Sequence, residues 1–378
     1  MLKKDNILKI HKKLKGKLKI ELNDSLETKK DLSIHYTPGI AKVSEHLYKN
    51  PNETKEYTWT SNNLAIISDG SAVLGLGNIG PYGALPVMEG KAMIFKRFAD
   101  INAIPIVLDV HDQKGIIETI KAIAPSFGAI NLEDIAAPIC FEVEETLKKE
   151  LDIPIMHDDQ HGTAVVVLAG LINSMKLAGK DLNNCKVVMV GVGAAGTAIA
   201  KLIHLYAPKV NLILLDSKGI ISKSRKDLNK FKKDLLKISN KENVSGDLQT
   251  AIAGSDVFLG VSKPNLLNDQ MIKSMNQKPI IFAMANPDPE VYPKDAKKAG
   301  AYIVATGRSD FPNQINNALA FPGIFRGALD NKVQKITDNH KIAAAKVIAG
   351  LVKKPTVDKI IPDIFYPNLV SLVSKVIK

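Results

Sequence analysis

Short apolar runs alternate with amphipathic stretches along the first half of the chain. Each run has an acidic residue at its end or next to it, and the runs cover residues 64–70, 104–112, 128–134 and 153–159. Stretches with a helical period lie between them at 114–127 and 142–150. This alternation is typical of parallel strands joined by crossover helices, so it predicts an α/β fold with a parallel sheet.

The second half begins with a long apolar stretch, predicted to be a helix at 162–177. An apolar strand, a glycine-rich turn, a helix and another strand follow it. Further strand patterns and two closing helices are predicted at 255–267, 278–290, 338–352 and after Pro367. The length of 378 residues suits two domains. We predict an N-terminal domain at 1–160 and a C-terminal domain at 161–378.

The glycine-rich turn has the spacing G-x-G-x-x-G. It consists of Gly191, Val192, Gly193, Ala194, Ala195 and Gly196. The first glycine permits a tight turn, the second lets the backbone approach a pyrophosphate, and the third lets the helix pack on the strand. Asp216 ends the next strand, twenty residues after Gly196, where an acid binds the ribose. The pattern predicts a dinucleotide site, and a glycine-rich turn without a cofactor is the alternative.

Acidic residues gather where the strands of the first half are predicted to end. The carboxyl ends of parallel strands meet at one edge of a sheet, and carboxylates crowded there repel one another unless a cation lies among them. Asp158 and Asp159 are adjacent at such an end, between an apolar run and an apolar helix. A helix cap with a solvated neighbour is the alternative interpretation for this pair.

Composition mainly excludes classes of function. No apolar run reaches the roughly 18 residues that a membrane span needs, and the two cysteines, Cys140 and Cys185, form no disulfide or zinc pattern. We expect a cytoplasmic protein with no membrane partner. The net charge is +12, but the lysines are dispersed beyond the first twenty residues and aromatic residues make up only 5%. Nucleic acid is therefore not an expected partner; the charge either steers an anionic small molecule or has no functional meaning.

Several spaced motifs together resemble the malic enzyme family, and in particular its short bacterial and archaeal branch. They are YTPGIA at 36–41, PVMEGKA at 86–92, INLEDI at 130–135, HDDQHGTA at 157–164, the glycine turn, ANPDPE and QINNALAFPG, in the order found in that family. The resemblance runs from about residue 15 to the C-terminus. One departure is the segment SDGSAVLGLGN, which lacks the arginine that grips a substrate carboxylate in longer members. The backbone of residues 74–80 is a candidate substitute.

The resemblance implies oxidation of malate to pyruvate and CO₂ with NAD or NADP and with Mg²⁺ or Mn²⁺. It implies that 1–160 is a substrate and metal domain and that 161–378 is a Rossmann-type dinucleotide-binding domain with C-terminal helices. It implies metal ligands at Glu133, Asp134 and Asp159. It also implies a catalytic lysine at Lys91 beside Asp158, an acid at Tyr36, malate contacts at Asn286 and Asn317, and a cofactor contact at Asn286. A homodimer is expected, with the basic N-terminal segment exchanged between subunits.

Three alternatives remain open at this point. The same scaffold suits an oxaloacetate decarboxylase or a malate-to-lactate converter, and a dinucleotide sensor without activity needs no proton-transfer pair. Tyr36 can also fill a domain interface rather than act as an acid. Asp216 favours NAD over NADP by charge repulsion, although Lys218 and Arg225 are close enough in sequence to bind a phosphate.

The segment around Lys91, LPVMEGKAMIF, is largely apolar, and we interpret the residues before Lys91 as a strand. Apolar surroundings and a nearby dication would lower the pKa of this lysine toward neutrality, whereas Asp158 would oppose that shift.

Overall fold

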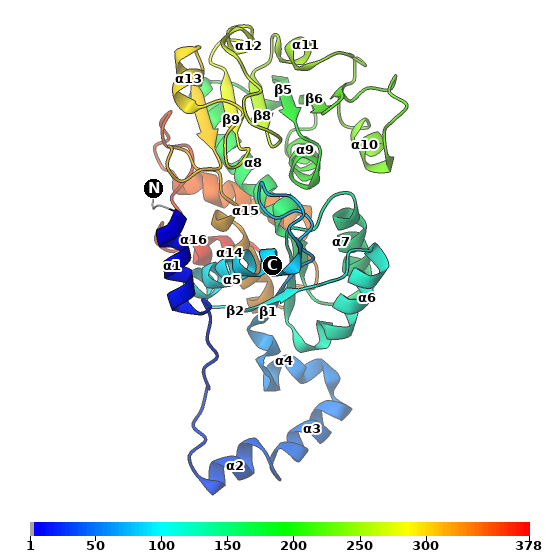
Figure 1. Ribbon diagram of the computed structural model, residues 1–378, viewed down its shortest axis with the longest axis vertical. Helices are drawn as coiled ribbons and strands as arrows, with labels where there is room; N and C mark the ends of the chain where they lie inside the picture. Colours follow the sequence, from blue (N-terminus) through cyan, green and yellow to red (C-terminus); the bar gives the residue numbers. More distant parts are fainter. Residues whose placement is uncertain (1–3) are drawn as a thin grey trace.

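A four-stranded parallel sheet forms the centre of the N-terminal half in the computed structural model, which describes residues 4–378 (Figure 1). Its strands are paired in the order β2-β1-β3-β4. Their bounds are Asn63–Ser68 for β1, Asn102–Val107 for β2, Ala129–Leu132 for β3 and Ile155–His157 for β4. All of them lie within the predicted runs or extend them by two residues or fewer, and their carboxyl ends share one edge of the sheet.

The helices of this half include two that the amphipathic pattern predicted, α6 (Gln113–Ile123) and α7 (Ile139–Glu150). The strand predicted before Lys91 is wrong, because that segment lies inside the 20-residue helix α5 (Gly80–Ala99). Pro86 and several glycines weaken the helical signal there, and packing against β1 and β2 decides the conformation. Helix α8 (Asp158–Ala178) begins four residues earlier than predicted, so Asp158 and Asp159 form its first turn.

The second sheet has the order β10-β9-β8-β5-β6-β7, with β7 antiparallel to β6 and the other pairs parallel. Its strands are β5 (Lys186–Val190), β6 (Asn211–Asp216), β7 (Gly219–Ile220), β8 (Val257–Gly260), β9 (Ile280–Ala283) and β10 (Ile303–Thr306). The order reverses between β5 and β8, and ligands bind at such a reversal in doubly wound folds. The α/β fold class is thus confirmed.

The helices α9 to α13 lie along the chain between strands of this sheet. They are α9 (Ala194–Tyr206), α10 (Lys230–Leu235), α11 (Leu248–Ile252), α12 (Asp269–Lys273) and α13 (Pro293–Lys298). Helix α9 follows the glycine-rich turn and packs along α8. The helix that follows the glycine-rich turn therefore packs against the buried helix that carries Asp158 and Asp159.

The C-terminal helices return to the first half of the molecule (Figure 1). They are α14 (Phe321–Asp330), α15 (Asp338–Leu351) and α16 (Leu369–Ser374). The ring of Phe95 on α5 lies 4.7 Å from that of Phe321 and 5.6 Å from that of Phe325. One contiguous core therefore runs from the first sheet through α8 and α14 to the second sheet. The domain boundary at residues 160 and 161 stays a prediction.

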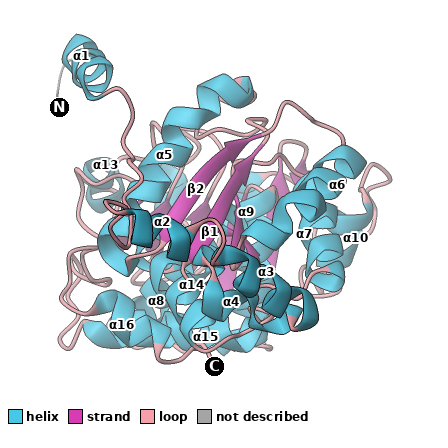
Figure 2. Ribbon diagram, turned by 90° about the horizontal axis from the view of Figure 1, so that it is seen from below, coloured by secondary structure: helices cyan, strands magenta, loops and turns pink. Residues whose placement is uncertain are grey.

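The N-terminal helices stand apart from this core. They are α1 (Lys4–Leu14), α2 (Lys29–His35), α3 (Ile40–Lys49) and α4 (Thr54–Tyr57). Figures 1 and 2 show α1 on one side of the body and α2 and α3 on an arm that projects from it. Helices α2 and α3, both described in full, bury none of their side chains. Most of their large apolar residues are exposed, as are those of α1, while Val43 and Leu47 of α3 are half-buried.

Helix α8 is also long and apolar enough to cross a membrane by length and composition alone. Within this protein 72% of its apolar window is buried. It lies against α9 and α15, which is the environment of a core helix.

The aromatic contact between α5 and α14 should contribute strongly to stability. We expect Phe95→Ala to lower the free energy of unfolding by about 3–5 kcal/mol, because it removes a fully buried ring and leaves a cavity. Urea denaturation followed by circular dichroism measures this loss. Phe98→Ala on the same helix is the control, since Phe98 is only partly buried and its loss should cost less. Equal losses in the two variants would contradict the prediction.

Candidate active site

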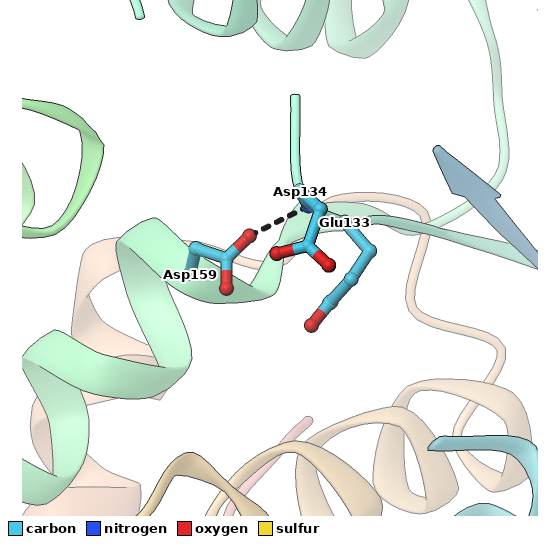
Figure 3. A group of neighbouring side chains, drawn as sticks. All are labelled: Glu133, Asp134 and Asp159. Atoms are coloured by element: carbon cyan, nitrogen blue, oxygen red, sulfur yellow. Dashed lines mark hydrogen bonds between the residues drawn. The ribbon is translucent and has the colours of Figure 1, made fainter. Parts of the chain in front are cut away.

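Three carboxylates converge where β3 and β4 end (Figure 3). Glu133 and Asp134 follow β3, and Asp159 is the second residue of α8. One oxygen from each lies within 4.8 Å of the others. Asp159 Oδ2 also accepts a hydrogen bond of 2.8 Å from the backbone N–H of Asp134. The three residues predicted as metal ligands are therefore neighbours in space, although α7 and β4 separate Asp134 from Asp159 along the chain.

The electrostatics of this cluster favour a cation. Burial and the nearby charge of Asp159 raise the pKa of Asp134 to about 7, and the same two causes raise the pKa of Glu133. Asp134 Oδ2 is buried and finds no hydrogen-bond partner anywhere in residues 4–378. Hard dications such as Mg²⁺ and Mn²⁺ prefer carboxylate oxygens. The donor set and the orphaned oxygen fit such an ion.

Lys91 reaches this cluster from the middle of α5. Its Nζ donates a hydrogen bond of 2.5 Å to Asp158 Oδ2, forms an ion pair with Glu133, and lies 4.5 Å from the centre of the Phe321 ring. Burial lowers the pKa of Lys91, but the charges of Asp158, Glu133 and Asp159 outweigh burial and raise it. Asp158 thus opposes the effect of desolvation, as expected, and the prediction that apolar surroundings and a dication together lower this pKa stays a prediction.

Asp158 is fully buried and occupies the centre of the arrangement. Its Oδ2 also accepts a hydrogen bond of 2.6 Å from Asn317 Nδ2, so Asn317, in the short helix η5 (Asn317–Leu319), joins the site. A Cβ atom on Gly162 would lie 1.8 Å from Asp158 Oδ1. The glycine of HDDQHGTA therefore leaves the space in which the carboxylate turns toward Lys91.

Two predicted site residues lie outside this cluster. Asn286 is exposed on the loop after β9, and its side chain makes one long hydrogen bond, 3.5 Å, to the carbonyl of Met284. Tyr36 caps the end of α2, on the projecting arm, and 66% of it is exposed. No hydrogen bond or ring contact in residues 4–378 joins Tyr36 to Lys91 or Asp158. A single chain brings the lysine and the carboxylates together but leaves the tyrosine apart.

The glycine-rich turn has the geometry that its spacing predicted. Gly191 has φ of +102°, which suits glycine. A Cβ on Gly196 would lie 1.8 Å from the carbonyl oxygen of Gly191, so only glycine lets α9 approach β5 this closely. A Cβ on Gly193 would meet no atom of the described chain within 4 Å. The space beside Gly193 and the start of α9, formed by Ala194 and Ala195, suits a pyrophosphate.

Asp216 is fully engaged at the end of β6. Its Oδ1 lies 2.7 Å from Arg225 Nη1, and its Oδ2 lies 2.6 Å from Lys232 Nζ. Burial opposes ionisation, but the hydrogen bonds from Arg225 and Lys232 lower the pKa of Asp216 to about 2. The sequence analysis named Arg225 as a possible phosphate ligand but did not foresee its pairing with Asp216, and it did not name Lys232, sixteen residues downstream.

Two supporting residues were missed by the sequence analysis. Asn131 on β3 donates a hydrogen bond of 2.9 Å to Glu133 Oε2. Glu144 on α7 accepts hydrogen bonds from the start of α8. A signal for Glu144 existed, because it is an acid in the apolar stripe of α7 between Cys140 and Leu147.

Comparison with known proteins matches both halves of the chain. Residues 15–116 match the malic enzyme N-terminal domain, and residues 160–377 match the malic enzyme NAD-binding domain. The bifunctional malic/malolactic enzyme of Bacillus subtilis is 49% identical over 99% of this chain and 92% of its own length. The NADP-dependent malic enzyme of Halomonas elongata is 45% identical over 91% of this chain and 81% of its own.

Among solved structures, the NAD-dependent malic enzyme of Thermotoga maritima superposes with a TM-score of 0.96 at 47% identity. The superposition covers 100% of this chain and 99% of that one. The chain therefore belongs to the malic enzyme family, since the domain matches, the sequence identity and the shared fold agree.

Proposed function

We propose that this protein oxidises malate with NAD or NADP and releases pyruvate and CO₂, in a reaction that requires Mg²⁺ or Mn²⁺. The observation that carries the proposal is Lys91, whose Nζ lies between Asp158 and Glu133 at the edge of the three-carboxylate cluster. A group that moves a proton is thereby placed beside the residues suited to a dication. A sensor of dinucleotides would need neither.

The residues of the chain take on separate tasks in this reaction. Glu133, Asp134 and Asp159 would hold the dication, which when bound supplies a Lewis acid for negative charge on the substrate oxygen. Lys91 would first give one ammonium proton to Asp158, 2.5 Å away, and the neutral amine would then take the hydroxyl proton of malate. Asn317 orients Asp158 by a hydrogen bond of 2.6 Å and would also contact the substrate.

The position of Tyr36 supports a further part of the proposal, that the active unit is a homodimer. The arm that carries Tyr36 leaves its apolar side chains exposed, and Leu74, Leu76 and Tyr82 beside the N-terminus of α5 are also exposed, Tyr82 by 88%. Apolar surfaces of this kind mark interaction sites. In a symmetric dimer, the arm of one subunit would place its Tyr36 near the Lys91 of its partner, where the phenol would protonate the carbon after CO₂ leaves.

NAD is the proposed preferred cofactor. Asp216 is ionised and stands where a carboxylate accepts hydrogen bonds from the adenosine ribose. A 2′-phosphate would meet that charge, at a cost of about 4 kcal/mol per unit charge at ~4 Å before relaxation. Arg225 and Lys232 offset part of this repulsion, but both already bind Asp216.

A malate-to-lactate reaction is the second candidate, because the Bacillus subtilis relative is named a malic/malolactic enzyme. The same site suits it if the reduced cofactor stays bound and returns its hydride to pyruvate. The two reactions differ in their products, since the first accumulates reduced cofactor and pyruvate and the second accumulates lactate.

A product assay with metal control tests the proposed reaction. With malate, Mn²⁺ and NAD, we expect absorbance at 340 nm to rise together with pyruvate. Excess chelator should abolish both signals, because the three clustered carboxylates are then left without their cation, and added Mn²⁺ should restore them. Full activity in chelator would remove the metal from the mechanism. Lactate without a rise at 340 nm would establish the second candidate instead.

Mixed dimers test whether Tyr36 acts across the subunit interface. Tyr36→Phe and Lys91→Ala should each be inactive alone. A purified heterodimer of the two, isolated with different affinity tags, should recover about half of the wild-type kcat, because one of the two equivalent sites then has an intact tyrosine and lysine. If Tyr36 served its own chain, both sites would be defective and the heterodimer would stay inactive.

Replacement of Asp216 tests cofactor choice. In Asp216→Ala, Lys232 loses its acidic partner and Arg225 keeps only Asp227, so both cations become more available to a 2′-phosphate. The ratio of kcat/KM for NADP to that for NAD should rise at least about tenfold, equivalent to about 1.4 kcal/mol. Asp227→Ala is the matched control, since it removes the other partner of Arg225 but keeps the carboxylate on β6. A wild type that prefers NADP, with no change in Asp216→Ala, would show that Asp216 is not the selector.

A further inference from the structure

A buried acid outside the carboxylate cluster, Glu144, contacts the start of α8 from the neighbouring helix α7. The side chain is 6% exposed. Its Oε1 accepts a hydrogen bond of 3.0 Å from the backbone N–H of His157, and its Oε2 lies 2.8 Å from His161 Nε2 and 3.4 Å from Gln160 Nε2. Every one of these groups lies within two residues of Asp158 or Asp159. Glu144 is thus hydrogen-bonded to both sides of the segment that carries Asp158 and Asp159.

The N-terminus of α8 depends on these hydrogen bonds, because no side-chain cap is formed by its N-cap residue within residues 4–378. His157 occupies the N-cap position, and its side chain makes no capping hydrogen bond in the part of the chain that the structure describes. Asp158 and Asp159 could cap the helix, but their bonded oxygens are committed to Lys91 and to the N–H of Asp134. A carboxylate supplied from another helix satisfies the free N–H and suits the positive end of the helix dipole.

The charge of Glu144 is paired with a lysine on its own helix and lies beside a histidine on α8. Lys148 Nζ lies 2.5 Å from Glu144 Oε1, one turn along α7. Burial disfavours the carboxylate form, but His161 and Lys148 outweigh burial and hold the pKa of Glu144 well below its usual range. Glu144 is therefore an acceptor for each of its hydrogen bonds.

A crevice of about 180 Å³ opens beside Glu144, between α7, α8, α9 and α15. Equal numbers of acids and lysines line it, namely Glu144, Glu145, Asp338, Lys148, Lys201 and Lys341. The formal charges cancel, so the crevice offers no net attraction to an anion. The contacts of Glu144 are with α8 itself, which indicates a supporting role for this residue rather than a second ligand site.

We propose that Glu144 is a positioning residue, which holds the junction of β4 and α8 so that Asp158 faces Lys91 and Asp159 faces the metal. This inference rests on the proposed function. Groups that orient metal ligands from behind alter metal affinity or activity by about 10–100-fold when they are removed. Glu144 would act through the backbone and side chains of residues 157–161, and it touches neither the substrate nor the ion.

The test measures metal binding separately from turnover. The Kd for Mn²⁺, followed by the electron paramagnetic resonance signal of free Mn²⁺ without malate, should rise by about 10–100-fold in Glu144→Ala. The Kd for NAD, measured by calorimetry, should stay unchanged, which a general loss of structure would not allow. Glu144→Gln keeps one acceptor oxygen for the N–H of His157, so it should regain part of the affinity. Glu145→Gln, next along α7 and exposed, is the matched control and should equal wild type.

The possible outcomes are distinct. If wild type binds Mn²⁺ and turns over malate while Glu144→Ala and Glu144→Gln bind Mn²⁺ equally well, the inference is wrong and the proposed function stands. If wild type neither binds Mn²⁺ nor oxidises malate, the proposed function fails and the inference fails with it. Should Glu144→Ala not fold, the comparison of Glu144→Gln with Glu145→Gln decides the question, and unchanged Mn²⁺ affinity in Glu144→Gln overturns the inference.

Discussion

Four carboxylates and one ammonium group meet at the edge of the first sheet, and this unequal charge constrains the structure around it. A buried carboxylate costs several kcal/mol unless it is paired or hydrogen-bonded. Lys91 reaches Asp158 and Glu133, whereas Asp134 and Asp159 pair with no lysine or arginine among residues 4–378, and Asp159 has only His157 Nδ1 at 3.8 Å. This lack of positive charge, together with burial, raises the pKa of Asp134. A site built in this way is stable only when it gains positive charge or protons.

The fold keeps these groups in place by drawing on both halves of the chain. Helix α8 carries two of the acids and packs against α9, so the carboxylates and the dinucleotide turn share one buried support. Asn317 and Phe321 come from the C-terminal part and close over Asp158 and Lys91. The contacts of Phe95 with α14 fix that closure from behind. The chemistry is therefore assembled from segments that are distant in the sequence.

The two charged regions of the molecule are organised in opposite ways. At the end of β6, Asp216 is balanced by Arg225 and Lys232, and a bound ribose would have to fit into contacts that already exist. At the ends of β3 and β4 the charge is left unbalanced. The first arrangement suits discrimination between NAD and NADP, because the pairing of Asp216 with Arg225 and Lys232 decides whether a 2′-phosphate is tolerated there. The second suits capture of a cation, because binding relieves repulsion.

The sequence by itself determined the features that depend on local spacing. These are the alternation of strands and helices, the acids at strand ends, the G-x-G-x-x-G turn and the ordered motifs that resemble one family. It misassigned the segment before Lys91, because Pro86 hides a helix that packing against β1 and β2 enforces.

Only the tertiary structure decided which groups meet across the chain. Lys232 approaches Asp216 through a fold of the backbone that no local pattern encodes, and Glu144 reaches α8 because α7 packs beside β4. The opposite holds for Tyr36, whose arm makes too few contacts within its own chain to bring it to Lys91. Local propensity sets each element, whereas the meeting of charges depends on the packing of whole elements, and that packing is a property of the complete fold.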